Sequence, residues 1–208
     1  MNGRSWMAIM VIASHVIFSA YGFWLPNDPR GSWSEFVGSW ELFRFGRAAK
    51  WNDTRSQAAE PHDHAVRLAA KKVLKHPPVQ FSGIQARAVG RGFARLVARS
   101  GVQVLACSIL PEHVHMVIQR HEYGVEQIVN LLKGDATRQL VQEGLHPFQG
   151  LVSAKERPPT PWARGEWKVF IDREVEVEHA IEYVEQNPIK EGKPPQRWPF
   201  VLPARGVL

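Results

Sequence analysis

The chain of 208 residues has ordinary proportions for a single globular domain, with 44% hydrophobic and 22% charged residues. Its formal net charge of +6 favours a polyanionic partner, and nucleic acid is the first candidate. Cys107 is the only cysteine, which excludes an internal disulfide and favours a reducing cytosolic location.

The first predicted element is a buried strand over residues 6–20, which overlaps the apolar run from Met7 to Leu25. Polar residues interrupt this run, which lacks a small-residue cleavage signal and is short of a clean membrane span. We therefore expect no targeting segment and no membrane partner. Residues 21–31 are rich in glycine and proline and predict an ordered loop.

The segment over about 32–60 mixes aromatic and basic side chains without a clean periodicity, and we interpret it as an insert. The aromatic residues are Trp33, Trp40, Phe43, Phe45 and Trp51, and the basic residues are Arg44, Arg47, Lys50 and Arg55. Such mixtures bind single-stranded nucleic acid, because bases stack on rings while cations follow the phosphates. Alternatively, the aromatic side chains cap the hydrophobic core and the basic side chains are simply solvated. Arg44 and Arg47 are our candidate DNA contacts here.

Residues 62–75 predict a helix that opens with His62-Asp63-His64. Positions i and i+2 of a helix lie about 200° apart, so we expect these two imidazoles not to share a metal ion.

A second helix is predicted from Ser82, a candidate N-cap, to Ser100, with Gly101 as its stop. It carries a stripe of arginines at i, i+4 spacing: Arg87, Arg91, Arg95 and Arg99. This stripe is either a solvated face or a track for phosphates.

Residues 102–110 and 113–119 predict two strands of a hairpin, separated by Leu110-Pro111-Glu112. Because side chains alternate along a strand, His113 and His115 share one face, and Val114, Met116 and Ile118 share the other. The two imidazoles lie about 7 Å apart along the strand, close enough to share one metal ion. The alternative is a half-exposed strand whose histidines bind nothing.

The helix predicted over 125–142 has an apolar face that is interrupted at 133–138, where Lys133 and Arg138 are candidate phosphate contacts. A loop over 144–165 and a strand over 167–171 follow. A last helix is predicted from a cap at Asp172 to Asn187, ended by Pro188. The tail over about 190–208 is irregular.

In this last helix, an apolar stripe of Val177, Ala180, Ile181 and Val184 predicts the buried face. His179, Tyr183 and Asn187 line a neighbouring stripe. A tyrosine at the rim of an apolar face is often only a packing residue. Its hydroxyl is also a nucleophile, and the amide oxygen one turn later can bind a hard cation.

The order of elements, with few short strands and long helices, predicts an α+β fold in which helices pack on a small, mainly antiparallel sheet. We expect one domain over 1–208.

Three motifs bring the chain close to a known family: Leu-Pro-Glu-His-Val-His-Met-Val-Ile at 110–118, Lys-Gly-x-x-Thr-Arg at 133–138 and Ala-Ile-Glu-Tyr-Val-Glu-Gln-Asn-Pro at 180–188. In this order they resemble the single-tyrosine HUH transposases, which include insertion-sequence and REP-associated tyrosine transposases. The Tyr-Gly-x-Trp-Leu-Pro-x-Asp-x-Arg-Gly loop at 21–31 is also similar.

The resemblance implies a ferredoxin-like (RRM-like) sheet in a protein, often a homodimer, that cleaves single-stranded DNA near a hairpin. His113 and His115 would bind Mg²⁺ or Mn²⁺, and Asn187 would be the third ligand, with Gln186 as the alternative. Tyr183 would attack the scissile phosphate and form a 5′-phosphotyrosine. A cytoplasmic, nucleoid-associated location follows from this activity.

Two features depart from the family pattern: Glu112 precedes the first histidine, where Asn or Asp is usual, and the insert is long. Neither departure removes a catalytic group, but Glu112 would alter the surroundings of the metal and the preference among metals.

Two other functions are open. A domesticated relative would bind hairpin DNA without cutting it, although the intact His113, His115 and Tyr183 argue against this. A hydrolase would use Cys107 with a nearby histidine, although a cysteine in the middle of an apolar strand is more often a buried structural thiol.

Overall fold

The computed structural model describes residues 10–32, 34–50, 61–151, 153 and 156–203. The strands are β1 (Ala13–Ser19), β2 (Val104–Ile109), β3 (His113–Gln119) and β4 (Trp167–Ile171). The α-helices are α1 (Trp40–Phe43), α2 (His64–Lys72), α3 (Gly83–Ser100), α4 (Val125–Gln142) and α5 (Glu174–Lys190), and Gln149–Leu151 form a 3-10 turn. Residues 6–9 of the first predicted strand, and Trp33, Trp51 and Arg55 of the insert, lie outside the described residues.

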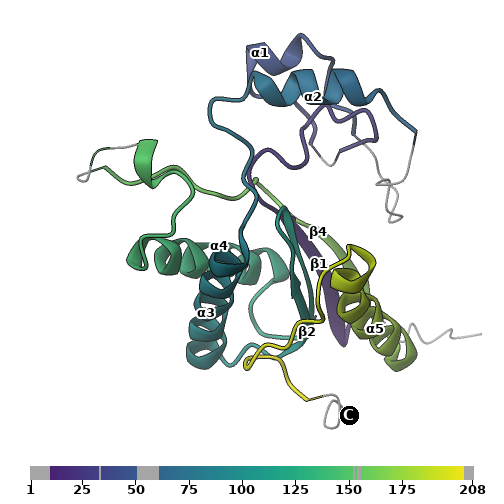
Figure 1. Ribbon diagram of the computed structural model, residues 1–208. Helices are drawn as coiled ribbons and strands as arrows, with labels where there is room; N and C mark the ends of the chain where they lie inside the picture. Colours follow the sequence, from purple (N-terminus) through teal and green to yellow (C-terminus); the bar gives the residue numbers. More distant parts are fainter. Residues whose placement is uncertain (1–9, 33, 51–60, 152, 154–155, 204–208) are drawn as a thin grey trace, which may run out of the picture.

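The four strands form one antiparallel sheet in the order β2-β3-β1-β4 (Figure 1). Helices α3 and α4 cover one face, and α5 covers the other. The succession β1-α3-β2-β3-α4-β4 with this strand order is the ferredoxin-like arrangement. The predicted α+β class is therefore confirmed, with α5 as an additional helix.

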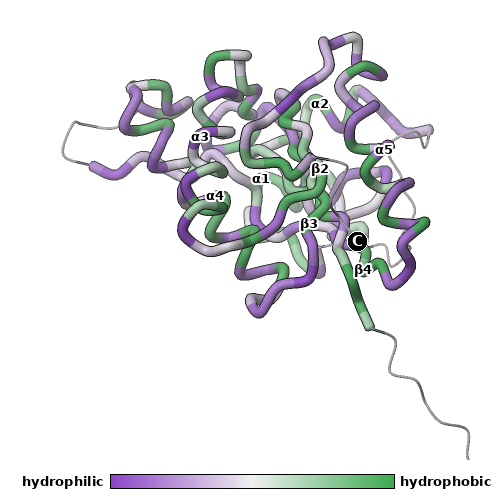
Figure 2. Tube along the Cα trace, turned by 90° about the horizontal axis from the view of Figure 1, so that it is seen from below, coloured by the Kyte–Doolittle hydropathy of each residue, from purple (hydrophilic) through white to green (hydrophobic). Residues whose placement is uncertain are grey.

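Strand alternation separates the two faces of β3 as the sequence predicts. Val114, Met116 and Ile118 pack into the large core under α3 and α4. Val117 belongs to a smaller cluster under α5, on the face that also carries His113 and His115. Coloured by hydropathy, β2 and β3 form hydrophobic segments through the middle of the molecule (Figure 2).

Helices α3 and α4 approach closely at Gly92, where an added Cβ would lie 2.6 Å from the Cα of Ala136. Only glycine allows the two backbones to come this near.

The arginine stripe of α3 also contacts α4. Arg91 binds Glu143, Arg95 binds Gln139, and Arg99 binds Asp135. Most of the stripe therefore links two helices, a role that the sequence did not suggest.

Helix α3 confirms its predicted ends. Ser82 forms a capping box with Gln85, and Gly101 closes the helix with a φ of 70°.

The predicted ends of α5 were wrong. Arg173 occupies the N-cap position instead of Asp172, and the helix continues through Pro188 to Lys190. A proline fixes φ near the helical value, so one more turn can form after it at the cost of a backbone hydrogen bond.

The first strand was predicted too long, since it begins only at Ala13 within the described residues. Helix α2 is also shorter than predicted, beginning at His64 and ending at Lys72. His62 therefore lies before the helix, and its ring centroid is 4.1 Å from that of His64. The argument that helical geometry separates these two rings was wrong, because only one of them is on the helix.

The loop at 21–31 is ordered, as predicted, by polar contacts within itself. The buried guanidinium of Arg30 forms an ion pair with Asp28 and stacks 3.8 Å from the ring of Trp24. Part of the predicted insert, together with α2, forms a third small cluster around Leu25, Leu42 and Ala70, above the end of the sheet (Figure 1).

The described part of the tail covers the open edge of β2. The side-chain amide of Gln196 binds both the N–H and the carbonyl of Ile109, and Leu202 donates its N–H to Val104. An exposed strand edge invites unwanted pairing, and the tail prevents it here. No helix in the described ranges is both long and apolar enough to cross a bilayer.

Candidate active site

Two histidines of β3 form the centre of the candidate site. The ring centroids of His113 and His115 lie 4.9 Å apart on the face of the sheet that α5 covers. His115 is buried, with 4% of its surface exposed. The structure thus brings the predicted pair together.

Helix α5 carries both Tyr183 and Asn187, and it brings Tyr183 to this pair. The ring of Tyr183 meets the ring of His115 edge-on at a centroid distance of 5.7 Å, and 42% of the tyrosine surface is exposed. Asn187 is buried, whereas Gln186, the alternative ligand, is exposed. The buried stripe anchored by Val177 and Val184 fixes this orientation of the helix.

Sequence reasoning missed two residues of the site. His15 on β1 lies with its Nε2 3.3 Å from Nδ1 of His115. Glu191 lies with its Oε1 3.8 Å from Nε2 of His113. Glu191 follows Asn187 by one helical turn, so a prediction that continued the helix beyond Pro188 would have found it. The position of His15 depends on the pairing of β1 with β3, for which the sequence carries no local signal.

Burial lowers the pKa of each histidine in the site. The pKa of His15 falls to about 4, and that of His115 falls to about 2 because nearby His113 and His15 add to the effect of burial. Burial also lowers the pKa of His113, although Glu191 and Glu112 oppose the shift. The three imidazoles are therefore neutral near pH 7, the state in which a ring nitrogen can bind a metal.

The two histidines of this site would need the side-chain amide of Asn187 as a third ligand to bind a divalent cation. No group of three or more His, Cys, Asp or Glu side chains suited to a metal occurs among the described residues. In the described ranges, two nitrogen atoms near this site are buried without a hydrogen-bond partner: Nδ1 of His113 and Nδ2 of Asn187. Imidazole nitrogens are typical ligands of transition metals, whereas an amide oxygen suits Mg²⁺ and Mn²⁺ alike.

The loop at 21–31 supports the site from one side. The ring of Phe23 stacks on that of His113 at a centroid distance of 5.0 Å and an interplanar angle of 8°. The ammonium of Lys71 on α2 lies 5.6 Å from the centre of the same phenyl ring. Phe23 therefore connects the loop at 21–31 and helix α2 to the histidine pair.

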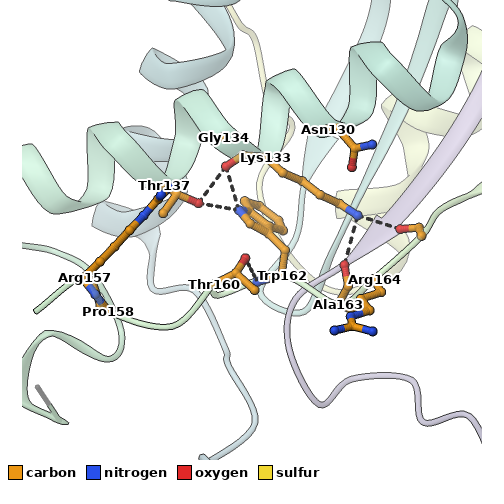
Figure 3. A pocket seen from close by; sticks show the side chains of 11 residues that line it. Asn130, Lys133, Gly134, Thr137, Arg157, Pro158, Thr160, Trp162, Ala163 and Arg164 are labelled. Carbon is orange, nitrogen blue, oxygen red and sulfur yellow. Dashed lines mark hydrogen bonds between the residues drawn. The ribbon is translucent and has the colours of Figure 1, made fainter. Parts of the chain in front are cut away.

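Lys133, a predicted phosphate contact, is buried and already bonded. Its ammonium donates to the carbonyls of Ala163 and Gly165, and burial lowers its pKa to about 8. It lines a cavity of about 450 Å³ between α4 and the segment before β4, which Arg157 and Arg164 also line (Figure 3). In this structure Lys133 ties α4 to that segment.

The other predicted DNA contacts are exposed. The guanidinium of Arg138 forms an ion pair with Asp135 while about half of its side chain stays exposed. Arg44 and Arg47 are exposed beside α1, where Trp40 is 75% exposed and stacks on Phe43. These groups lie on different parts of the chain from the histidine pair.

Cys107 lies in the large apolar core, and burial raises the pKa of its thiol. A thiolate is not accessible there, so the structure gives the hydrolase hypothesis no support.

The structure thus places paired histidines and a partly exposed tyrosine together on one face of a ferredoxin-like sheet. Residues 79–187, more than half of the chain, match the family model described as "Transposase IS200 like". The chain belongs to the IS200-like transposase family.

Two solved structures are similar to this chain. One is the structure of a REP-associated tyrosine transposase bound to a REP hairpin, with 14% identity, coverage of 96% of this chain and 81% of that chain, and a TM-score of 0.47. The other is a protein described as a transposase from Deinococcus radiodurans, with 11% identity, coverage of 93% and 98%, and a TM-score of 0.40. No curated protein matches the chain.

Proposed function

We propose that this transposase cleaves single-stranded DNA beside a hairpin and uses Tyr183 to form a 5′-phosphotyrosine. The observation that carries the proposal is the position of Tyr183, whose ring contacts His115 while 42% of its surface remains exposed. A nucleophile has to be near the groups that activate the phosphate and also within reach of the DNA, and Tyr183 meets both conditions.

The phenolic oxygen of Tyr183 attacks the scissile phosphorus, and its proton is lost. The bond from phosphorus to the 3′ oxygen breaks, and that oxygen takes up a proton and leaves as a 3′ hydroxyl. The phosphate stays on Tyr183 with the 5′ end of the strand. A second 3′ hydroxyl can reverse these steps and join a new strand without ATP, because the phosphodiester energy is kept in the intermediate.

His113, His115 and Asn187 would hold Mg²⁺ or Mn²⁺, which supplies positive charge to the phosphate as it reacts. Burial lowers the pKa of both histidines, which keeps their ring nitrogens unprotonated and available for this role. The carboxylate of Glu191 adds a negative group beside His113, and Asn187 is favoured over Gln186 because it is the buried one of the two.

DNA binding is assigned to the basic surfaces outside this site. Arg44 and Arg47 can contact phosphates while bases stack on Trp40, and Arg138 retains an exposed guanidinium. The homodimer implied by the resemblance is part of the same proposal.

The test is incubation of the protein with labelled single-stranded hairpin DNA from its flanking genomic sequence and Mn²⁺, followed by denaturing electrophoresis. Wild-type protein should form a covalent adduct, and Tyr183→Phe should bind the DNA but form none. The ring is kept in this variant, so packing against His115 should change little.

Tyr123→Phe is the matched control, since Tyr123 packs against His121 and the large core, away from α5. It should form the adduct at the wild-type level. Hairpin binding without any wild-type adduct would instead favour the non-cutting alternative, and an adduct in Tyr183→Phe would assign the nucleophile elsewhere.

A further inference from the structure

His15 is a buried polar side chain in the site for which the proposed chemistry has no use. It is one of the few polar residues on β1 that are nearly inaccessible, with 9% of its surface exposed. Burying an imidazole without a function costs free energy, so its contacts need an explanation.

Each contact of His15 is with the candidate site or its walls. Its Nε2 lies 3.3 Å from Nδ1 of His115, its ring meets the ring of Tyr183 at 5.7 Å, and its ring meets that of Trp167 at 5.4 Å. Strand pairing places it there, because Ile17 lies opposite His115 and His15 is two residues away on the same face. One side chain thus contacts both the candidate ligand and the candidate nucleophile.

The hydrogen bond between the two imidazoles has two arrangements, and only one allows metal binding. If Nδ1 of His115 carries the proton and donates it, Nε2 of His115 keeps a free lone pair. If His15 donates instead, a neutral His115 carries its proton on Nε2 and cannot bind a cation through that atom. The direction of this bond therefore decides whether His115 can be a ligand.

We propose that His15 is a positioning residue whose Nε2 accepts the Nδ1–H of His115, which fixes the tautomer and ring orientation of His115 so that its Nε2 binds the metal. This inference rests on the proposed function. A ring N–H of a metal-binding histidine usually donates to a carboxylate, a carbonyl or water, and here a second histidine takes that place. A cavity of about 320 Å³ beside His15, which Glu176 and His179 also line, has room for water at its remaining ring nitrogen.

Three variants test this role through metal binding to the protein without DNA. His15→Leu fills the space but accepts no hydrogen bond, and His15→Gln keeps an acceptor. His179→Leu is the matched control, because His179 lines the same cavity but is exposed on α5. Titration calorimetry with Mn²⁺ should show affinity about 10–100-fold weaker for His15→Leu, with much of it restored in His15→Gln. The affinity of His179→Leu should equal that of the wild type.

Nitrogen-15 NMR of the imidazoles reads the tautomer directly. Wild-type His115 should carry its proton on Nδ1, and His15→Leu should show a mixture. Unchanged Mn²⁺ affinity in His15→Leu, or a proton on Nε2 of His115 in the wild type, overturns the inference. A His15→Leu protein that does not unfold cooperatively on heating is misfolded. In that case the test rests on the Mn²⁺ affinity of His15→Gln and on the tautomer of His115 in the wild type.

The outcome for His15 is separable from the outcome for the proposed function. Wild-type protein that binds Mn²⁺ in a His15-dependent way but forms no DNA adduct would contradict the cleavage proposal alone. Wild-type protein that forms the adduct, with Mn²⁺ affinity indifferent to His15→Leu, would contradict the positioning role alone.

Discussion

The two faces of the sheet differ in what they bury. Under α3 and α4, the side chains of Phe18, Phe93 and Leu132 are inaccessible, and the helices touch at Gly92. The face under α5 has a smaller apolar cluster, and it also carries the histidines and the exposed Tyr183. Because successive residues of a strand point to opposite faces, one sheet can keep a dry core on one side and a polar site on the other.

On the α5 face, the apolar side chains hold the helix against the sheet, and the polar side chains form the candidate site. Val177 and Val184 are buried against Val117 and hold the helix in place. Tyr183 and Asn187, beside them on the same helix, are then oriented without belonging to the core. The comparison predicts that substitutions of the site residues on the α5 face abolish activity in a folded protein. Substitutions of core residues on the other face should instead destabilise the fold.

The largest expected effect is on the α5 face. His115→Ala should lower the rate of adduct formation at least about a hundredfold, because the charge on the reacting phosphate loses a stabilising partner. Hairpin binding, measured by a gel shift, should persist. EDTA added to the wild type should reproduce this result. An active His115→Ala protein in buffer with Mn²⁺ would show that the two faces do not differ in this way.

The next effect is on the opposite face. Phe93→Ala should lower the free energy of unfolding by about 3–5 kcal/mol, since it empties part of a fully buried core. Urea unfolding followed by circular dichroism measures this loss. Phe170→Ala is the control, because Phe170 is exposed on β4 and its loss should cost far less. Equal destabilisation by both variants would contradict the assignment of the main core to the α3 and α4 face.

The smallest effect lies outside both faces, on the insert. Arg47→Glu should weaken hairpin binding several-fold and reduce the dependence of affinity on salt, because a phosphate contact releases counterions. Arg87→Glu reverses an exposed charge on α3 and serves as the control. If both variants weaken binding equally, the effect comes from net charge and the insert is not a specific contact surface.

The sequence determined those features whose signals are local. The hairpin, the ends of α3 and the bounds of α4 follow from alternation, from the Ser82 cap and from Gly101, and each was predicted correctly. The alternation along β3 is by itself enough to place His113 and His115 on one face, because the side-chain period of a strand is two residues.

Only the tertiary structure decided which distant side chains meet these residues. The register of β1 against β3 brings His15 to His115, and the continuation of α5 past Pro188 brings Glu191 to His113. Lys133 looked like a surface cation in the sequence, but packing against the segment before β4 buries it. Strand register and burial depend on the sum of many long-range contacts, which no short stretch of sequence encodes.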